Sequence, residues 1–138
     1  MTVTLTELIE ENLDSLVDGI TKDAIRQIPS YGKAPIKLTM ARVERLLRVL
    51  VESIRRNNPN VLEQYLAGIG EERRERAYPI GELHAVLEIV EQHLRDLVVR
   101  SSTQEVERNA QLALVDATMA SARMILSKTY LLLAKADS

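Results

Sequence analysis

Apolar residues recur at intervals of three and four positions along almost the whole chain, which is the periodicity of helices that bury one face. Thr4 with Glu7, and Ser102 with Glu105, have the spacing of capping boxes that start helices. The pattern predicts no strand. The expected fold class is therefore all-α, a single-domain five-helix bundle within residues 1–138, with helices at 5–28, 39–56, 59–70, 79–101 and 103–135.

Prolines lie at the boundaries between the first four predicted helices. Pro29 is expected to end the first helix, because the residue before a proline is driven out of the helical conformation. The segment IPSYGKAP then reads as a connector in which the ring of Tyr31 lies on the core. Thr39 is the expected cap of the second helix. Asn58 is the expected cap of the third, with Pro59 at its first position.

The last predicted helix has more apolar surface than one packing contact needs. Its main seam, the candidate dimer interface, consists of Leu112, Val115, Met119, Ala122, Leu126, Tyr130 and Leu133. A second strip beside it consists of Ala113, Ala117, Ala120, Met124 and Leu131. Helices that are apolar on two sides are usually covered from two directions. We expect one strip to pack on the chain itself and the other on a second copy, which predicts a homodimer. The alternative is a central helix in a monomeric bundle.

Composition narrows the function classes. The chain has no cysteine, which excludes disulfides, thiolate catalysis and cysteine-ligated metals. Its first residues are acidic, unlike a secretory signal, so a cytoplasmic protein is expected. The most apolar region, residues 112–134, is interrupted by Asp116, Arg123 and Lys128, so no membrane association is expected.

Residues suited to catalysis or cofactor binding are sparse. His84 and His93 are nine positions apart, which places them on opposite sides of one helix and prevents them from sharing a metal. Neither lies in a Glu-x-x-His pattern. His93 could in principle ligate haem, although a partly buried structural role is favoured. No phosphate-binding loop or nucleophile motif occurs, and paired carboxylates such as Glu71 and Glu72 lie in polar runs. Neither an enzyme nor a cofactor is expected.

Arginines concentrate in the middle of the chain. Residues 33–76 carry ten basic and six acidic side chains, although the net charge of the whole chain is −2. A basic surface can bind nucleic acid, but glutamates are interleaved and aromatic side chains are few. Ion pairing along a solvated helix face is the preferred interpretation, and no nucleic-acid partner is expected.

Several short motifs occur in a distinctive order. They are the family-motif positions Ile28, Pro29, Tyr31, Asn58, Pro59, Tyr65, Leu66 and Arg76, followed by Ile80-Gly81-Glu82-Leu83. This order resembles the N-terminal domain of RsbR-type regulators, the RsbT co-antagonist proteins of bacterial stressosomes. The resemblance implies a non-enzymatic, globin-like sensor domain that dimerises and usually binds no haem. It also implies a STAS domain beyond Ser138, through which a STAS-domain scaffold and a serine/threonine switch kinase would be partners.

The expected function is a sensor and protein-interaction domain whose last helix relays a change in dimer packing to an output domain. Two alternatives remain open. One is a globin-like sensor that binds haem or another small ligand, and the other is a small dimeric adaptor or DNA-binding regulator.

Overall fold

The computed structural model describes residues 3–75 and 80–136, except for the side chains of residues 70–75, 80, 133 and 136. Within these ranges the chain forms seven helices and no strand, which confirms the all-α class. The helices are α1 (Leu5–Glu11), α2 (Leu13–Gln27), α3 (Pro29–Gly32), α4 (Ile36–Arg56), α5 (Pro59–Glu75), α6 (Ile80–Ser101) and α7 (Glu105–Ala136).

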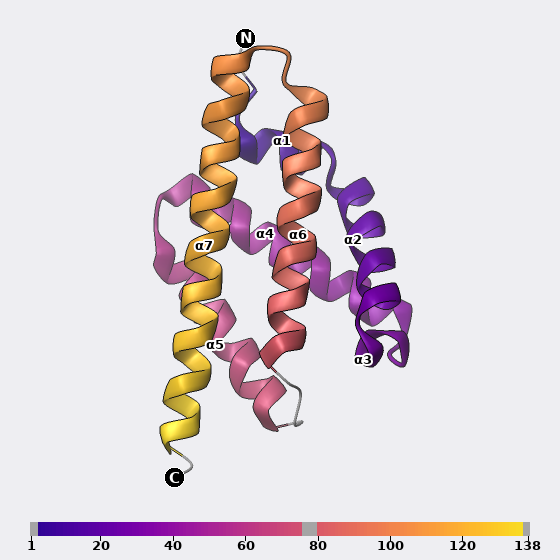
Figure 1. Ribbon diagram of the computed structural model, residues 1–138, viewed down its shortest axis with the longest axis vertical. Coiled ribbons are helices and arrows are strands. Elements are labelled where there is room, and N and C mark those ends of the chain that lie inside the picture. Colours follow the sequence, from indigo (N-terminus) through magenta and orange to yellow (C-terminus); the bar gives the residue numbers. More distant parts are fainter. Residues whose placement is uncertain (1–2, 76–79, 137–138) are drawn as a thin grey trace.

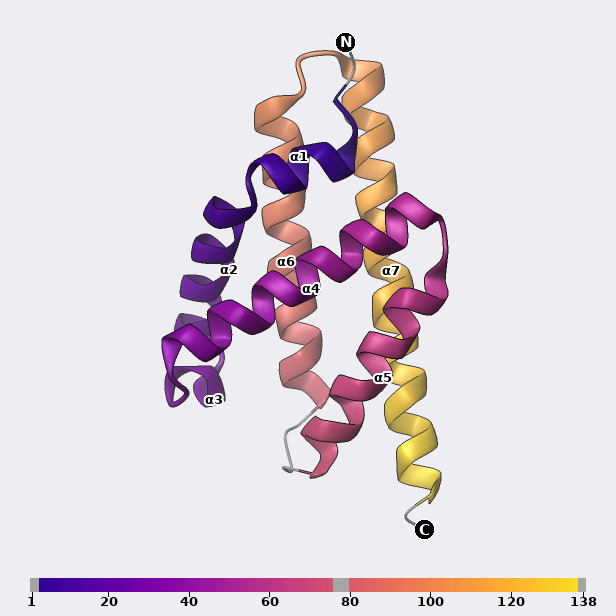
Figure 2. The ribbon, with the colours of Figure 1, turned by 180° about the vertical axis from the view of Figure 1, so that it is seen from behind.

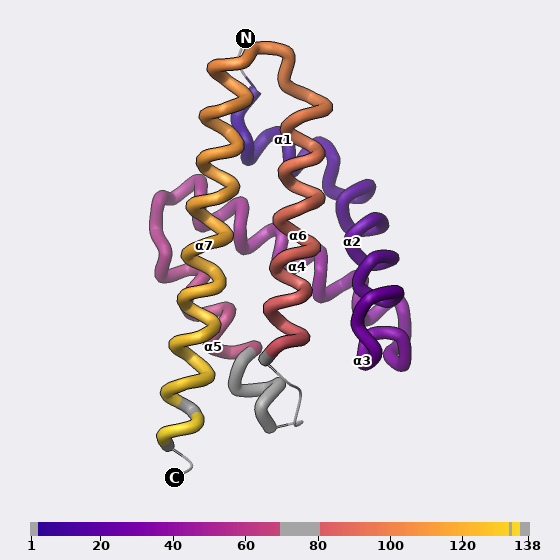
Figure 3. The backbone as a smooth tube through the Cα atoms, in the orientation of Figure 1, coloured from indigo at the N-terminus to yellow at the C-terminus, as the bar shows by residue number. Residues whose placement is uncertain are grey.

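The helices form two layers (Figures 1 and 2). Helices α6 and α7 make a long antiparallel hairpin that forms one layer by itself. Helix α4 crosses behind this hairpin, α5 runs along α7, and α1 and α2 lie beside α6. The backbone trace in Figure 3 shows that the start of α1 lies near the α6–α7 connection. There the side-chain amide of Gln111 donates to the carbonyl of Val3 at 2.6 Å.

The core lies between the two layers. Its most deeply buried side chains come from α1, α2, α4, α5, α6 and α7, so every long helix contributes one apolar face. They include Ile9, Ile20, Leu47, Leu50, Leu62, Leu87, Val90, Val98, Val115, Met119 and Leu126. Burial of this apolar surface is the main favourable term that holds the layers together.

The first predicted helix is two helices, so the prediction of one continuous helix over 5–28 is wrong. Asn12 interrupts it with non-helical backbone angles, φ −116° and ψ 19°. Its side-chain amide donates to the carbonyl of Leu8 at 2.8 Å and so satisfies a carbonyl at the end of α1. An asparagine side chain that competes with the helical hydrogen bonds favours such a break. The break lets α1 and α2 take different directions (Figure 2).

The IPSYGKAP segment, predicted as a connector, contains a short helix. Pro29 ends α2 as expected but also opens the short helix α3, because Ile28 before it is extended. Tyr31 is buried, which confirms that its ring lies on the core. Helix α4 begins at Ile36, three residues before the predicted start. Thr39 is therefore a buried residue inside α4, and its assignment as the cap is wrong.

The other helix boundaries show which capping signals act. The Thr4 hydroxyl accepts from the Glu7 amide at 3.2 Å, and Asn58 Oδ1 accepts from the Asn60 amide at 3.0 Å, so both predicted caps are confirmed. Ser102 does not cap the last helix, because it lies three residues before the start of α7 at Glu105, and its amide donates to the Val98 carbonyl at the end of α6. Helix α7 begins at Glu105 instead of residue 103, and α5 continues five residues past its predicted end.

Candidate functional site

The main seam of α7 lies inside the core. Met119 and Ala122 are 0% exposed, and Val115 and Leu126 are 1% exposed. Leu112 and Tyr130 are half-buried against the same core, and the side chain of Leu133 lies outside the described part. Helices α5 and α6 cover this seam. Within this fold the chain's own helices therefore cover the four buried residues of the candidate dimer interface.

The second strip of α7 faces outward. Ala113, Ala117 and Ala120 are exposed, Met124 is 69% exposed and Leu131 is 57% exposed. Val106, at 85% exposed, and Ala110 extend the strip toward the start of α7, an extension that the sequence analysis missed. In Figure 1 no described helix lies in front of the α6–α7 hairpin. At 1.5 Å per residue, the strip from residue 106 to 131 is roughly 38 Å long. We call these seven residues the outer strip.

Two ion pairs join α7 to α6. Arg95 on α6 pairs with Asp116, and Arg123 pairs with Glu91 on α6 at 2.6 Å. Arg123 and Glu91 are both half-buried, and the hydrogen bond that Arg123 donates to the Glu91 carboxylate raises the pKa of the Arg123 guanidinium. The two pairs are consistent with the rotation of α7 that buries its seam, and burial of the apolar seam makes the larger contribution to that rotation.

The two histidines lie apart, as their spacing predicts. Nε2 of His84 lies 3.1 Å from the Ser127 hydroxyl on α7, whereas Nε2 of His93 lies 2.6 Å from an Asp23 carboxylate oxygen on α2. The His93 ring also lies on Gly19, where a Cβ would come within 2.9 Å of Cε1. His93 therefore connects α6 to α2. In the described part of the chain, no three histidine, aspartate or glutamate side chains gather as a metal site would require.

The arginines of α4 mostly contact carboxylates. Arg48 lies 3.6 Å from Glu44, Arg56 pairs with Glu52, and Arg55 pairs with Glu10 on α1. The expected ion pairing is confirmed for these three arginines. The side chains of Arg73, Arg74 and Arg76 lie outside the described part.

The family-motif positions other than Arg76, which lies outside the described residues, are found at helix starts and in or against the core. Pro29 opens α3, and Asn58 and Pro59 open α5. Ile28, Tyr31 and Leu66 are buried, and Tyr65 is half-buried beneath Arg45. These positions are thus spread over several helices.

Comparison of the chain with models of protein families, with curated proteins and with solved structures found no match. The resemblance to RsbR-type regulators therefore depends on the short motifs alone. None of the helices, over their described residues, combines the length and apolarity needed to cross a bilayer.

Proposed function

We propose that this chain is a non-enzymatic sensor and protein-interaction domain of an RsbR-like regulator in the bacterial cytoplasm. In this proposal the chain is a globin-like bundle that forms a homodimer through the outer strip. Helix α7 relays changes in dimer packing to a STAS or other output domain, and that domain contacts the STAS-domain scaffold and the switch kinase. The pathway comes from the resemblance, whereas the outer strip supports the dimer.

The observation that carries the proposal is the outer strip itself. Seven apolar positions follow one exposed line along α7, and four of them are alanines. Small side chains let two helix backbones approach closely, while the larger Val106, Met124 and Leu131 can interdigitate with a partner. A monomer gains nothing from an apolar strip in water, and such strips typically mark interaction surfaces.

The strip also suits a relay. Helix α7 has 32 residues and contacts the core along one side only. A small rotation of α7 would therefore change its seam contacts with α5 and α6 and its outer-strip contacts with the partner at the same time. Helix shifts of about 1–2 Å at subunit interfaces are a common form of such switching.

The experiment is to place a charge on the strip. We expect the parent chain to scatter light as a dimer and Met124→Glu or Ala117→Glu to scatter as a monomer, because each carboxylate would be buried without a partner. The matched control is Leu38→Glu on α4, whose leucine is also exposed but belongs to the other layer. A monomeric parent, or glutamate variants that remain dimeric, would refute the proposed dimer.

Single-cysteine variants test the orientation of α7 independently, because the parent has no cysteine. Ala120→Cys on the outer strip should form a disulfide-linked dimer on oxidation, and Leu38→Cys should form no disulfide-linked dimer under the same conditions, although it keeps the non-covalent dimer. Equal cross-linking of both variants would show random collision instead of a dimer through α7.

A further inference from the structure

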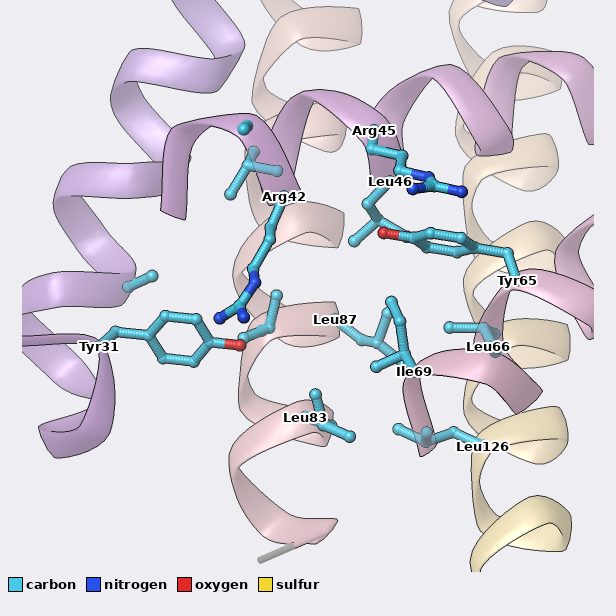
Figure 4. Close-up of a pocket in the computed structure, with 14 residues that line it drawn as sticks. Tyr31, Arg42, Arg45, Leu46, Tyr65, Leu66, Ile69, Leu83, Leu87 and Leu126 are labelled. Atoms are coloured by element: carbon cyan, nitrogen blue, oxygen red, sulfur yellow. The ribbon is translucent and has the colours of Figure 1, made fainter. Parts of the chain in front are cut away.

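An apolar pocket of about 280 Å³ lies between α4, α5, α6 and α7. Figure 4 shows leucines and an isoleucine from these four helices that form its floor. These floor residues are Leu46, Leu66, Ile69, Leu83, Leu87 and Leu126. The five leucines are buried, so the pocket extends into the core between the two layers.

An apolar space of this size leaves packing incomplete. Protein cores are close-packed, and few voids in them are larger than a water molecule. Side chains that border a void lose the dispersion contacts that atoms on its other side would supply. The leucines around the pocket lack such contacts, and an apolar molecule in the pocket would provide them.

The polar side chains of the pocket are already engaged. The Arg45 guanidinium carbon lies 5.6 Å from the centre of the Tyr65 ring, in a cation–π contact. Tyr31, Arg42 and Tyr65, which also line the pocket, each have an interaction partner besides this contact. A charged ligand would have to compete with these partners, whereas an apolar ligand needs only the aliphatic wall.

The volume and the access of the pocket limit the ligand further. An apolar cavity of about 150 Å³ stays dry and admits benzene, so a pocket of about 280 Å³ has room for a compound of two fused rings. Ala41 and Arg45 line the pocket and are exposed, so the pocket reaches the surface beside α4. A small molecule can therefore enter without the helices separating.

We propose that the pocket binds a neutral, apolar ring compound about the size of naphthalene. Its rings lie on Leu66, Leu83 and Leu87, and they contact Leu126 of the α7 seam. Burial of apolar surface supplies the affinity, and a net charge on the ligand opposes it because a buried charge loses its hydration. The inference goes beyond the proposed function, because neither the dimer nor the relay is needed for binding.

The first test compares probes that differ in one property each. The compounds 2-naphthylmethanol, 2-naphthoate and 2-naphthylmethylammonium share two rings but carry no, a negative and a positive charge, and benzyl alcohol is neutral with one ring. By titration calorimetry we expect one 2-naphthylmethanol per chain, bound at least about tenfold more tightly than either ion. Benzyl alcohol should also bind more weakly, because it buries less apolar surface.

The position of the probe can be measured without any substitution. Nuclear Overhauser effects between the naphthyl protons of 2-naphthylmethanol and the methyl groups of Leu66, Leu83 and Leu87 would place it in this pocket. The same effects at leucines outside the pocket, and none at these three, would place it elsewhere.

The second test fills the pocket. Leu83→Trp places an indole ring in the space and should weaken binding of 2-naphthylmethanol at least about tenfold, because the two ring systems exclude each other. The matched control is Val99→Trp on the same helix, because Val99 is 54% exposed and lies outside the pocket. This variant should bind like the parent. Thermal unfolding checks that both variants fold, and the nuclear Overhauser measurement on the parent tests the site independently of them.

The proposal is overturned if 2-naphthylmethanol does not bind at millimolar concentration, if either ion binds as tightly, or if Val99→Trp weakens binding as much as Leu83→Trp. The same titration on Met124→Glu separates this inference from the proposed function. Binding that persists in a monomer supports the pocket whatever the fate of the dimer, and a parent dimer that does not bind 2-naphthylmethanol refutes the pocket alone.

Discussion

Helices α4 and α7 bury one face in the same core but present opposite kinds of surface to water. On α4, Leu47 and Leu50 are buried, and the exposed side carries arginines, several of them paired with glutamates. On α7, the seam around Met119 is buried equally well, yet the opposite side is the apolar outer strip. The contrast shows that the faces of a surface helix can have two different roles. A single apolar face completes the core, and a second one provides an interface for another molecule.

The largest expected loss of stability comes from truncating the buried faces of α4 and α7, which tests whether the two faces are equivalent. Leu47→Ala on α4 and Leu126→Ala on α7 should each lower the free energy of unfolding by about 2–5 kcal/mol, because both leucines are fully buried. Urea unfolding followed by circular dichroism measures both. A loss below about 1 kcal/mol for Leu126→Ala alone would show that the α7 seam does not belong to the core.

An intermediate loss of stability is expected from breaking ion pairs, and it should differ between the pairs of α4 and α7. Glu91→Gln should cost about 1 kcal/mol, because it breaks a half-buried pair that joins α6 to α7. Glu44→Gln should cost less than about 0.5 kcal/mol, because its partner Arg48 is exposed on the same helix. Equal costs in urea unfolding would mean that the Arg123–Glu91 pair contributes no more than the exposed pair on α4.

The direction in which the pKa of Arg123 is shifted determines how its contribution to stability depends on pH. The Glu91 hydrogen bond raises the pKa of Arg123 above its ordinary value, so this arginine contributes its full stabilisation below that value and loses it only as the pH rises through the higher folded pKa. Stability should consequently show no Arg123 titration across the neutral range, and the difference between the parent and Glu91→Gln should be unchanged between neutral and mildly alkaline urea unfolding.

The smallest effect on the fold of one chain is expected on the exposed sides. Met124→Ser and Arg48→Ser should each change the stability of the dilute protein by less than about 0.5 kcal/mol. They should differ in concentration dependence, because a dimer is stabilised by mass action. The Tm of the parent and of Arg48→Ser should rise with protein concentration, and that of Met124→Ser should rise less. Identical concentration dependence would remove the distinction between the two surfaces.

Local signals in the sequence were sufficient where no distant contact competed with them. The caps at Thr4 and Asn58 are correct, and so is the separation of His84 from His93, because each depends on residues a few positions apart. The break at Asn12 and the burial of Thr39 were missed, because asparagine is compatible with more than one local backbone conformation and because the burial of Thr39 depends on how α4 packs in the core. Whether an asparagine caps, continues or interrupts a helix is decided by packing as much as by propensity.

By itself the sequence determined that this protein is helical and that its last helix has two apolar strips, because the three-and-four periodicity is a property of the local chain. The tertiary structure decided which strip turns inward, since periodicity sets the angle between strips but not which one the neighbouring helices cover. The packing of α5 and α6 on Met119 and Leu126 assigned the seam to the core and left the outer strip exposed. It likewise brought Tyr31 and Tyr65 to one pocket, a proximity between residues far apart in the chain that no local pattern encodes.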